Sequence, residues 1–159
     1  MEPLKTFLVL DGNALLHRAW HAIPPLTTRD GRVVNAAYGF TNVVEKMLNI
    51  YQPAYMAVAW DLPGATFRHE AYKPYKAQRE KKADELYEQI PMIQEILAAY
   101  GIPSLSAPGF EADDIIGTIA QMNADEGGIE TLIVTGDRDA LQLVNDTTKV
   151  VFFIKGLSE

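Results

Sequence analysis

The sequence predicts an α/β protein in which helices cover both faces of a mostly parallel sheet of about five strands. Short apolar runs, typical of buried strands, alternate along the chain with longer segments whose apolar residues recur at helical spacing. At 159 residues, 48% hydrophobic and 22% charged, the chain is long enough for one globular domain with a sizeable core. Neither a repeat nor a low-complexity linker divides it, so a single domain is expected over residues 1–159.

The first half of the chain supplies two strands and a helix. The run Phe7–Asp11 (FLVLD) predicts a buried strand that ends in an Asp-Gly turn, and residues 55–61 (YMAVAWD) predict a second strand that also ends on aspartate. Between them, residues 36–51 carry apolar side chains on one helical face. Residues 62–83 are polar, basic and aromatic without a clear period, which predicts an excursion away from the sheet.

The second half continues the alternation of helices and strands. Residues 84–100 place apolar side chains on one helical face, and Pro91 should kink or restart that helix, because proline removes a backbone donor. A further helix is expected at 113–126, closed by Gly127 and Gly128. The remaining strands are expected at residues 102–106, 131–135 and 149–154.

Acidic residues follow each of the first four predicted strands. In a parallel sheet the carboxyl ends of the strands meet at one edge, and ligands bind just outside that edge. Like charges held close together repel, so a strongly positive ligand is expected there. The seven candidate residues are Asp11, Asp61, Glu111, Asp113, Asp114, Asp137 and Asp139.

Carboxylate oxygens without histidine or cysteine nearby suit hard divalent cations, Mg²⁺ or Mn²⁺ rather than Zn²⁺. Two such ions about 4 Å apart would clamp a phosphodiester, one activating water and the other neutralising charge on the leaving oxygen. Taken singly, the acids have ordinary explanations: Asp113 or Asp114 as a helix cap, and Asp11 or Asp61 as part of a turn. A phospho-acceptor receiver domain also gathers acids at strand ends. The recurrence at four successive strand ends favours a shared metal site.

The net charge is −7, but the basic residues are unevenly distributed. Six of the fourteen Lys and Arg residues lie close to aromatic side chains within one short stretch: Arg68, Lys73, Lys76, Arg79, Lys81 and Lys82. Cations on phosphates and rings on bases suit single-stranded or frayed nucleic acid, with stacking worth about 1–3 kcal/mol per base. Alone, such a stretch is more typical of a solvated loop; beside a phosphodiester site, nucleic-acid binding is favoured.

Some classes are excluded by composition. The chain has no cysteine, so it has neither disulfides nor a thiolate metal site, and a reducing compartment fits. No apolar run approaches the roughly 20 residues of a membrane span, and the N-terminus lacks the apolar stretch of a signal peptide. We therefore expect a cytoplasmic protein without a membrane partner. His17, His21 and His69 lack further metal-ligand residues nearby in sequence and are interpreted as ordinary residues.

Five stretches together resemble the N-terminal part of the 5′→3′ exonuclease domain (5′ nuclease or flap endonuclease) of bacterial DNA polymerase I, within the PIN-like nuclease superfamily. They are FLVLDGNALLHRAWHAIPPLTT, AAYGFTNVV, MAVAWDLPGATFRHEAYKPYKAQR, GIPSLSAPGFEADDIIGTIA and LIVTGDRDALQLV. They occur in order over essentially the whole chain. The pair EADD-x-IG and TGDRD is highly specific.

The resemblance implies a PIN-like three-layer fold, two divalent metals (Mg²⁺ or Mn²⁺), and hydrolysis of DNA at 5′ ends, flaps and nicks in replication and repair. It implies ligands at all seven acids, with Asp11, Asp61, Glu111 and Asp113 favoured for the first metal and Asp114, Asp137 and Asp139 for the second, directly or through water. Catalytic roles are implied for Asp61, Asp113, Lys76 and Arg79. The implied DNA-binding residues, on a helical arch at about 68–87, are Arg68, Tyr75, Lys76, Arg79, Lys81 and Lys82.

Two departures from the family pattern limit these implications. Members usually have a Pro-rich turn after YK-x-x-R, whereas this chain has Glu80-Lys81-Lys82-Ala83, so its arch is expected to be more helical or differently shaped. The family's domain also runs on well beyond this length, into a duplex-binding half with further aspartates. For this stretch alone we therefore expect an incomplete second metal site and weak or absent activity, with a polymerase domain attached in the full-length protein.

Two other functional classes remain open. A PIN-type ribonuclease would be complete in about this length and would need only the acids, so cleavage of single-stranded RNA against flap DNA separates it. A catalytically silent module that binds branched DNA would give no heat on titration with Mg²⁺, and Asp137→Ala would then change nothing.

Overall fold

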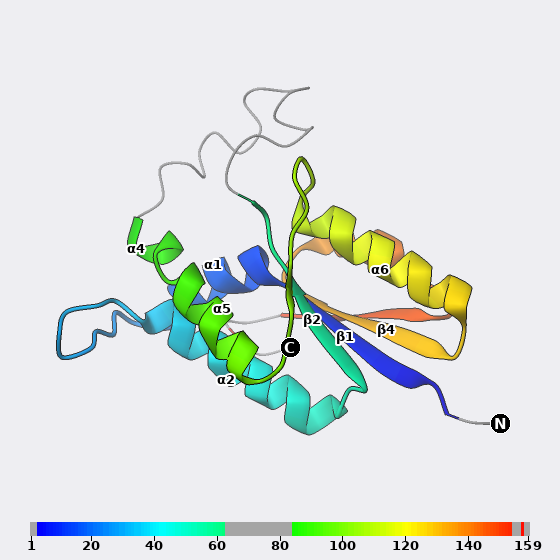
Figure 1. Ribbon diagram of the computed structural model, residues 1–159, viewed down its shortest axis with the longest axis horizontal. Helices are drawn as coiled ribbons and strands as arrows, with labels where there is room; N and C mark the ends of the chain where they lie inside the picture. The colour runs from blue at the N-terminus through cyan, green and yellow to red at the C-terminus, as the bar shows by residue number, and fades with distance from the viewer. Residues whose placement is uncertain (1–2, 63–83, 154–156, 158–159) are drawn as a thin grey trace.

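The computed structural model describes residues 3–62, 84–153 and 157. Within these residues the chain forms a five-stranded sheet in which every pairing is parallel, with the strand order β3-β2-β1-β4-β5 (Figure 1). The α/β prediction is confirmed. The strands are β1 (Lys5–Asp11), β2 (Tyr55–Ala59), β3 (Ser104–Leu105), β4 (Ile129–Thr135) and β5 (Thr148–Phe152).

Helical segments connect these strands, mostly where the sequence predicts them. Pro91 lies in the first turn of the second of two helices that replace the single periodic segment 84–100, so the expected restart is confirmed. The third strand is shorter than the predicted 102–106, because only Ser104 and Leu105 pair with β2. The helical segments are α1 (Gly12–Ala22), α2 (Asn35–Tyr51), α4 (Asp84–Tyr87), α5 (Ile90–Ala99), α6 (Ala112–Glu126) and the 3₁₀ helix η2 (Arg138–Leu143).

The two faces of the sheet bury separate apolar clusters. Because side chains alternate along a strand, Leu8 and Leu10 face one way and Val9 the other. The first face packs against α1, α2, α4 and α5, and the second lies beneath α6 and η2, which Figure 1 shows on opposite sides of the sheet. The expected three-layer arrangement is confirmed. None of the described helices has the length and apolarity that crossing a bilayer would require.

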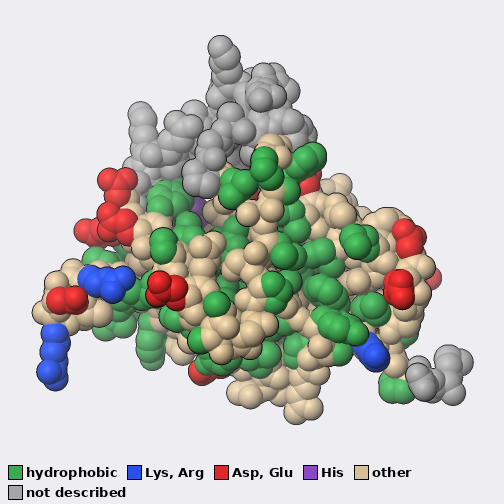
Figure 2. Space-filling model, viewed as in Figure 1, with side chains coloured by type: hydrophobic (Ala, Val, Ile, Leu, Met, Phe, Trp, Pro, Cys, Tyr) green, Lys and Arg blue, Asp and Glu red, His purple; other side chains and the backbone are tan. Residues whose placement is uncertain are grey.

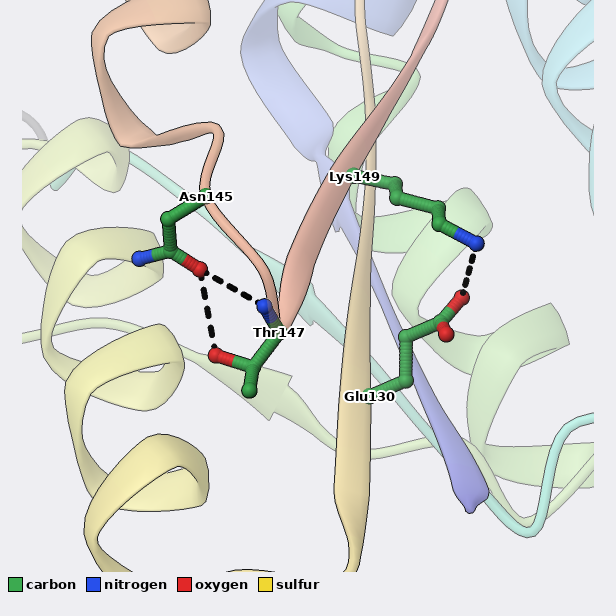
Figure 3. A network of polar contacts seen from close by, with 4 residues as sticks. All are labelled: Glu130, Asn145, Thr147 and Lys149. Atoms are coloured by element: carbon green, nitrogen blue, oxygen red, sulfur yellow. Dashed lines mark hydrogen bonds and ion pairs between the residues drawn. The ribbon is translucent and has the colours of Figure 1, made fainter. Parts of the chain in front are cut away.

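The edge strand β5 is held by polar contacts at the amino end of the sheet (Figure 3). Lys149 on β5 pairs with Glu130 on β4, with 3.3 Å between Nζ and Oε1. In the preceding turn, Asn145 Oδ1 accepts hydrogen bonds from the backbone N–H and the hydroxyl of Thr147, at 2.9 and 3.1 Å. These contacts lie at the opposite end of the strands from the predicted acids and do not occupy that edge.

The start of α1 is packed too tightly for any side chain larger than hydrogen. A Cβ atom on Gly12 would lie 2.7 Å from two ring atoms of Trp60 and 2.8 Å from the carbonyl oxygen of Ala59. Trp60 cannot easily retreat, because it is buried and stacked on Phe40 with 5.5 Å between ring centroids. Gly12 therefore sets how closely α1 approaches the end of β2.

We expect Gly12→Ala to lower the free energy of unfolding by about 1–3 kcal/mol, the usual penalty for overpacking a filled core. Urea unfolding monitored by circular dichroism measures this. Gly117→Ala is the matched control, because its Cβ would meet only Leu143 at 3.9 Å, and in mid-helix it should stabilise by roughly 0.5–1 kcal/mol. Equal urea midpoints for Gly12→Ala and the unchanged chain would contradict the close approach of Gly12 to Trp60.

Candidate functional site

The predicted acids gather around the carboxyl edge of the sheet, where β1 lies between β2 and β4. Leu10 of β1 is paired with Val134 of β4, and Asp11 is paired with Ala59 of β2. Strands β2 and β3 lie on one side of β1, whereas β4 and β5 lie on its other side. The order of connection therefore reverses at β1. Such a reversal opens a crevice at the carboxyl ends, where open α/β sheets bind ligands.

Asp11, the last residue of β1, lies at the centre of this edge. It is only 5% exposed and caps α1. Its Oδ1 accepts a hydrogen bond from the backbone N–H of Ala14 and its Oδ2 accepts one from the hydroxyl of Thr135, both at 3.2 Å. Burial, followed by the negative charge of Asp113 and then that of Asp61, raises the pKa of Asp11 to about 7. The described chain therefore concentrates negative charge here.

Asp61 ties the end of β2 to the beginning of α6. Its backbone N–H donates to Asn13 Oδ1 at 2.8 Å, and its own Oδ1 accepts from the backbone N–H of Ala112 at 2.7 Å. Ala112 is the first residue of α6, where unpaired N–H groups and the helix dipole favour negative charge. Asp61, which taken singly was explained as part of a turn, therefore places its own carboxylate beside the N-terminus of α6.

The cluster Glu111–Asp114 forms the start of α6 itself. Glu111 is buried at the N-cap position, and its backbone N–H donates to Asp114 Oδ2 at 2.9 Å in a capping box. The N-cap residue is therefore Glu111, not Asp113 or Asp114 as the sequence suggested, and Asp114 contributes to the cap from the third helical position. Asp113 is half-buried, and its negative charge raises the pKa of Asp11 more than the charge of Asp61 does.

Asp137 and Asp139 follow β4 at the start of η2. The backbone N–H of Asp137 donates to Thr135 Oγ1 at 3.0 Å, while its own Oδ1 accepts from the backbone N–H of Asp139 at 2.9 Å. Asp139 is exposed, and Asp137 is half-buried. The structure thus connects Asp137 to Asp11 through one hydroxyl group and leaves Asp139 at the rim.

The donor chemistry of this edge fits a hard divalent cation, because the candidate side chains are all carboxylates. The raised pKa of Asp11 also indicates that negative charge is unfavourable there without a cation. Their positions are not gathered into one coordination sphere: among the described residues no three His, Cys, Asp or Glu side chains form a group that could hold a metal ion. Backbone N–H groups restrain Asp11, Asp61, Asp114 and Asp137 instead. A carboxylate can accept about four hydrogen bonds or metal contacts, so one such bond does not exhaust it.

Three residues that sequence reasoning did not single out help to build this edge. Asn13 and Thr135 bond directly to the strand-end acids. Arg18 of α1 donates to the carbonyl oxygen of Phe153 at 3.1 Å and lies against Gly136, between β4 and Asp137. The sequence signal for Asn13 and Thr135 is that they lie beside the acids in DGN and TGD, and Arg18 lies about two helical turns after Asp11. Their contacts depend on strands that are distant in sequence.

The predicted substrate-binding residues lie outside the described residues. They are Arg68, Tyr75, Lys76, Arg79, Lys81 and Lys82, and of the expected arch at 68–87 only α4 is described. Figure 2 shows few basic side chains among the described residues of the viewed face, where hydrophobic side chains gather across the middle. Nucleic-acid binding by those six residues stays a prediction.

Residues 6–158 match the family described as 5′-3′ exonuclease, N-terminal resolvase-like domain. A curated relative, the DNA polymerase I of Mycobacterium tuberculosis, is 47% identical over 156 residues, which are 97% of this chain and 17% of that protein. The chain therefore spans less than a fifth of the length of the curated relatives it matches.

Two solved structures share the fold. The first, zinc-bound T5 5′-exonuclease, superposes with a TM-score of 0.73 at 19% identity, covering 94% of this chain and 55% of that one. The second, the flap endonuclease of bacteriophage T5 in a pseudo-enzyme–product complex with DNA and metal ions, gives 0.68 at 18% identity over the same shares. At these identities the likeness shows the fold.

Proposed function

Because the chain belongs to the 5′-3′ exonuclease family, as its N-terminal resolvase-like domain, we propose that it is part of a metal-dependent 5′→3′ exonuclease and flap endonuclease. Its reaction is the hydrolysis of DNA phosphodiester bonds at 5′ ends, flaps and nicks. One observation supports this most strongly: Asp11 is buried at the carboxyl edge with the charges of Asp113 and Asp61 raising its pKa. With Asp11 ionised such an arrangement is unfavourable, and a bound divalent cation would relieve it.

The proposed cation is Mg²⁺, or Mn²⁺ in its place. Asp11, Asp61, Glu111 and Asp113 would hold the first ion, and Asp114, Asp137 and Asp139 would hold a second or its water ligands. When bound there, the ion would lower the pKa of a water that acts as the nucleophile and would neutralise charge on the phosphate. The family relatives named DNA polymerase I and the metal-containing T5 structures support this assignment.

The chain's own residues bind and orient the reacting groups. The α6 N-terminus directs the N–H of Ala112 to Asp61, which fixes that carboxylate beside Asp11. Lys76 and Arg79 are proposed to bind the substrate phosphates as preorganised cations, with Arg68, Tyr75, Lys81 and Lys82 contacting the strand. The T5 flap endonuclease complex with DNA supports a DNA substrate. In the intact protein, as in the relatives, we propose an attached polymerase.

A cleavage assay tests this function. In the full-length protein we expect Mn²⁺-dependent cutting of a labelled 5′-flap DNA near the branch point, abolished by a chelator and by Asp11→Asn. Single-stranded RNA of the same length is the comparison substrate. Preferential RNA cleavage would favour the PIN-type ribonuclease instead. Calorimetry with Mg²⁺ or Mn²⁺ covers the case of a silent binding module, for which neither heat nor cleavage is expected.

A further inference from the structure

We propose that Thr135 is a positioning residue for the metal ligands: its hydroxyl fixes the carboxylate of Asp11 against the main chain of Asp137, so that the ligands proposed for the two ions keep their relative positions. This inference rests on the proposed function and extends it to a residue that contacts neither metal nor substrate. Thr135 is the last residue of β4 and is only 1% exposed.

The sheet register brings Thr135 beside Asp11. Leu10 is paired with Val134, so the next residues along the two parallel strands, Asp11 and Thr135, are neighbours. Their hydroxyl–carboxylate bond, from Oγ1 to Oδ2, spans 3.2 Å across 124 positions of sequence. The preceding odd-numbered residues Val9 and Ile133 belong to the cluster beneath α6, and Asp11 and Thr135 continue that face. The contact therefore follows from strand pairing and the alternation of side chains.

The direction of the hydroxyl hydrogen is determined by its two partners. The backbone N–H of Asp137 donates to Thr135 Oγ1 at 3.0 Å, so the oxygen is an acceptor on that side. A hydroxyl carries one hydrogen, and the acceptor carboxylate of Asp11 receives it. The other oxygen of Asp11 is held by the N–H of Ala14. Both oxygens of Asp11 are thus restrained, and the plane of its carboxylate is fixed.

One hydroxyl thereby couples the ends of β1 and β4. Asp137 is anchored through its main chain to Thr135, and its Oδ1 is oriented by the N–H of Asp139. Partners of metal ligands that fix ligand orientation commonly change metal affinity by 10- to 100-fold when removed, about the range expected here. Without the hydroxyl, Asp11 would regain rotation about its side chain, and the N–H of Asp137 would lose its acceptor.

The chain offers matched variants that separate positioning from packing. Thr135→Val keeps the shape and removes the hydroxyl, whereas Thr135→Ser keeps the hydroxyl. Thr148→Val is the control, because Thr148 is also 1% exposed but lies on β5 at the amino end of the sheet, paired with Thr131. Among the described residues the hydroxyl of Thr148 has no hydrogen-bond partner, so its removal breaks no such bond.

The experiment titrates Mn²⁺ into each protein by calorimetry at pH 8, with urea unfolding of each metal-free variant measured in parallel. We expect Thr135→Val to raise the Mn²⁺ dissociation constant at least tenfold. Thr135→Ser should stay within about twofold and Thr148→Val should match the unchanged chain, because both keep the Thr135 hydroxyl. If Thr135→Val does not fold, Thr135→Ala removes the same hydroxyl without placing a methyl group in its position. It is expected to show the same loss of Mn²⁺ affinity.

Two results overturn the inference in different ways. If the unchanged chain binds Mn²⁺ and the hydroxyl-free variants bind equally well, Thr135 does not position the ligands, while the proposed function stands. If the unchanged chain itself binds no Mn²⁺, the proposed function fails, and this inference fails with it.

Discussion

Replacing Asp11 with asparagine is expected to raise the free energy of unfolding of the metal-free chain by roughly 4 kcal/mol above pH 7. The pKa of Asp11 is about 7 in the folded chain against 3.8 as an ordinary aspartate, and each pKa unit corresponds to about 1.4 kcal/mol. The folded state therefore binds this proton more tightly than the unfolded state. The contribution of Asp11 to stability falls as pH rises from about 4 to about 7 and is constant above that range.

Urea unfolding at several pH values between 4 and 8, in a chelator, measures this effect. Asp11→Asn should remove the decline with pH and converge with the unchanged chain at the acid end. Asp30→Asn is the control: the hydroxyl of Thr28 lowers the pKa of Asp30, which is fully exposed, so its effect has the opposite sign and falls below about pH 4. That variant should therefore leave the decline between pH 4 and pH 8 unchanged. If the free energy of unfolding of Asp11→Asn still falls with pH as it does in the unchanged chain, the charge on Asp11 is already neutralised within the chain.

In the full-length protein, Asp61→Asn is expected to slow metal-dependent cleavage of a 5′-flap by roughly a thousandfold, because losing one ligand charge removes several kcal/mol of transition-state stabilisation. Asparagine keeps an oxygen that can accept the bond from the N–H of Ala112, so the start of α6 should remain in place. Single-turnover rates measure the loss.

Asp125→Asn provides the comparison for this change. Asp125 lies exposed in the last turn of α6, at the end away from the acids, and accepts a bond from Gln121. Cleavage by that variant should equal that of the unchanged chain. If Asp61→Asn cleaves within tenfold of the unchanged chain, Asp61 is a structural cap for α6 and has no part in the chemistry.

The strands and the shared edge of acids were predictable because they depend on local pattern and one topological rule. Apolar runs ended by Asp11 and Asp61 indicated buried strands, and the parallel sheet follows from their alternation with helices. Every predicted acid lies at or beyond the carboxyl ends of the first four strands. Whether they bind a metal together was predicted from chemistry and stays a prediction.

Features that depend on distant partners were not predictable. Helix α1 was missed because Asp-Gly is typical of a turn. Its start is a helix cap in which Asp11 accepts from the N–H of Ala14, and Gly12 fits there against Trp60, which follows β2. The buried pair Asn35 and Gln89 is another case. Gln89 bonds to Asn35, Ala37 and Glu85, and Asn35 to the carbonyl ends of α1, so one amide pair joins α1, α2 and α4. Thr135 belongs to the same class of contact.

The positions of bound Mn²⁺ in a crystal of this chain test the central claim most directly, through anomalous scattering. The account predicts a strong peak at the carboxyl edge, within coordination distance of Asp11 and at least two of Asp61, Glu111 and Asp113, whose side chains turn inward from their metal-free positions. An edge that stays empty at saturating Mn²⁺, with the carboxylates still in their metal-free positions, would contradict it.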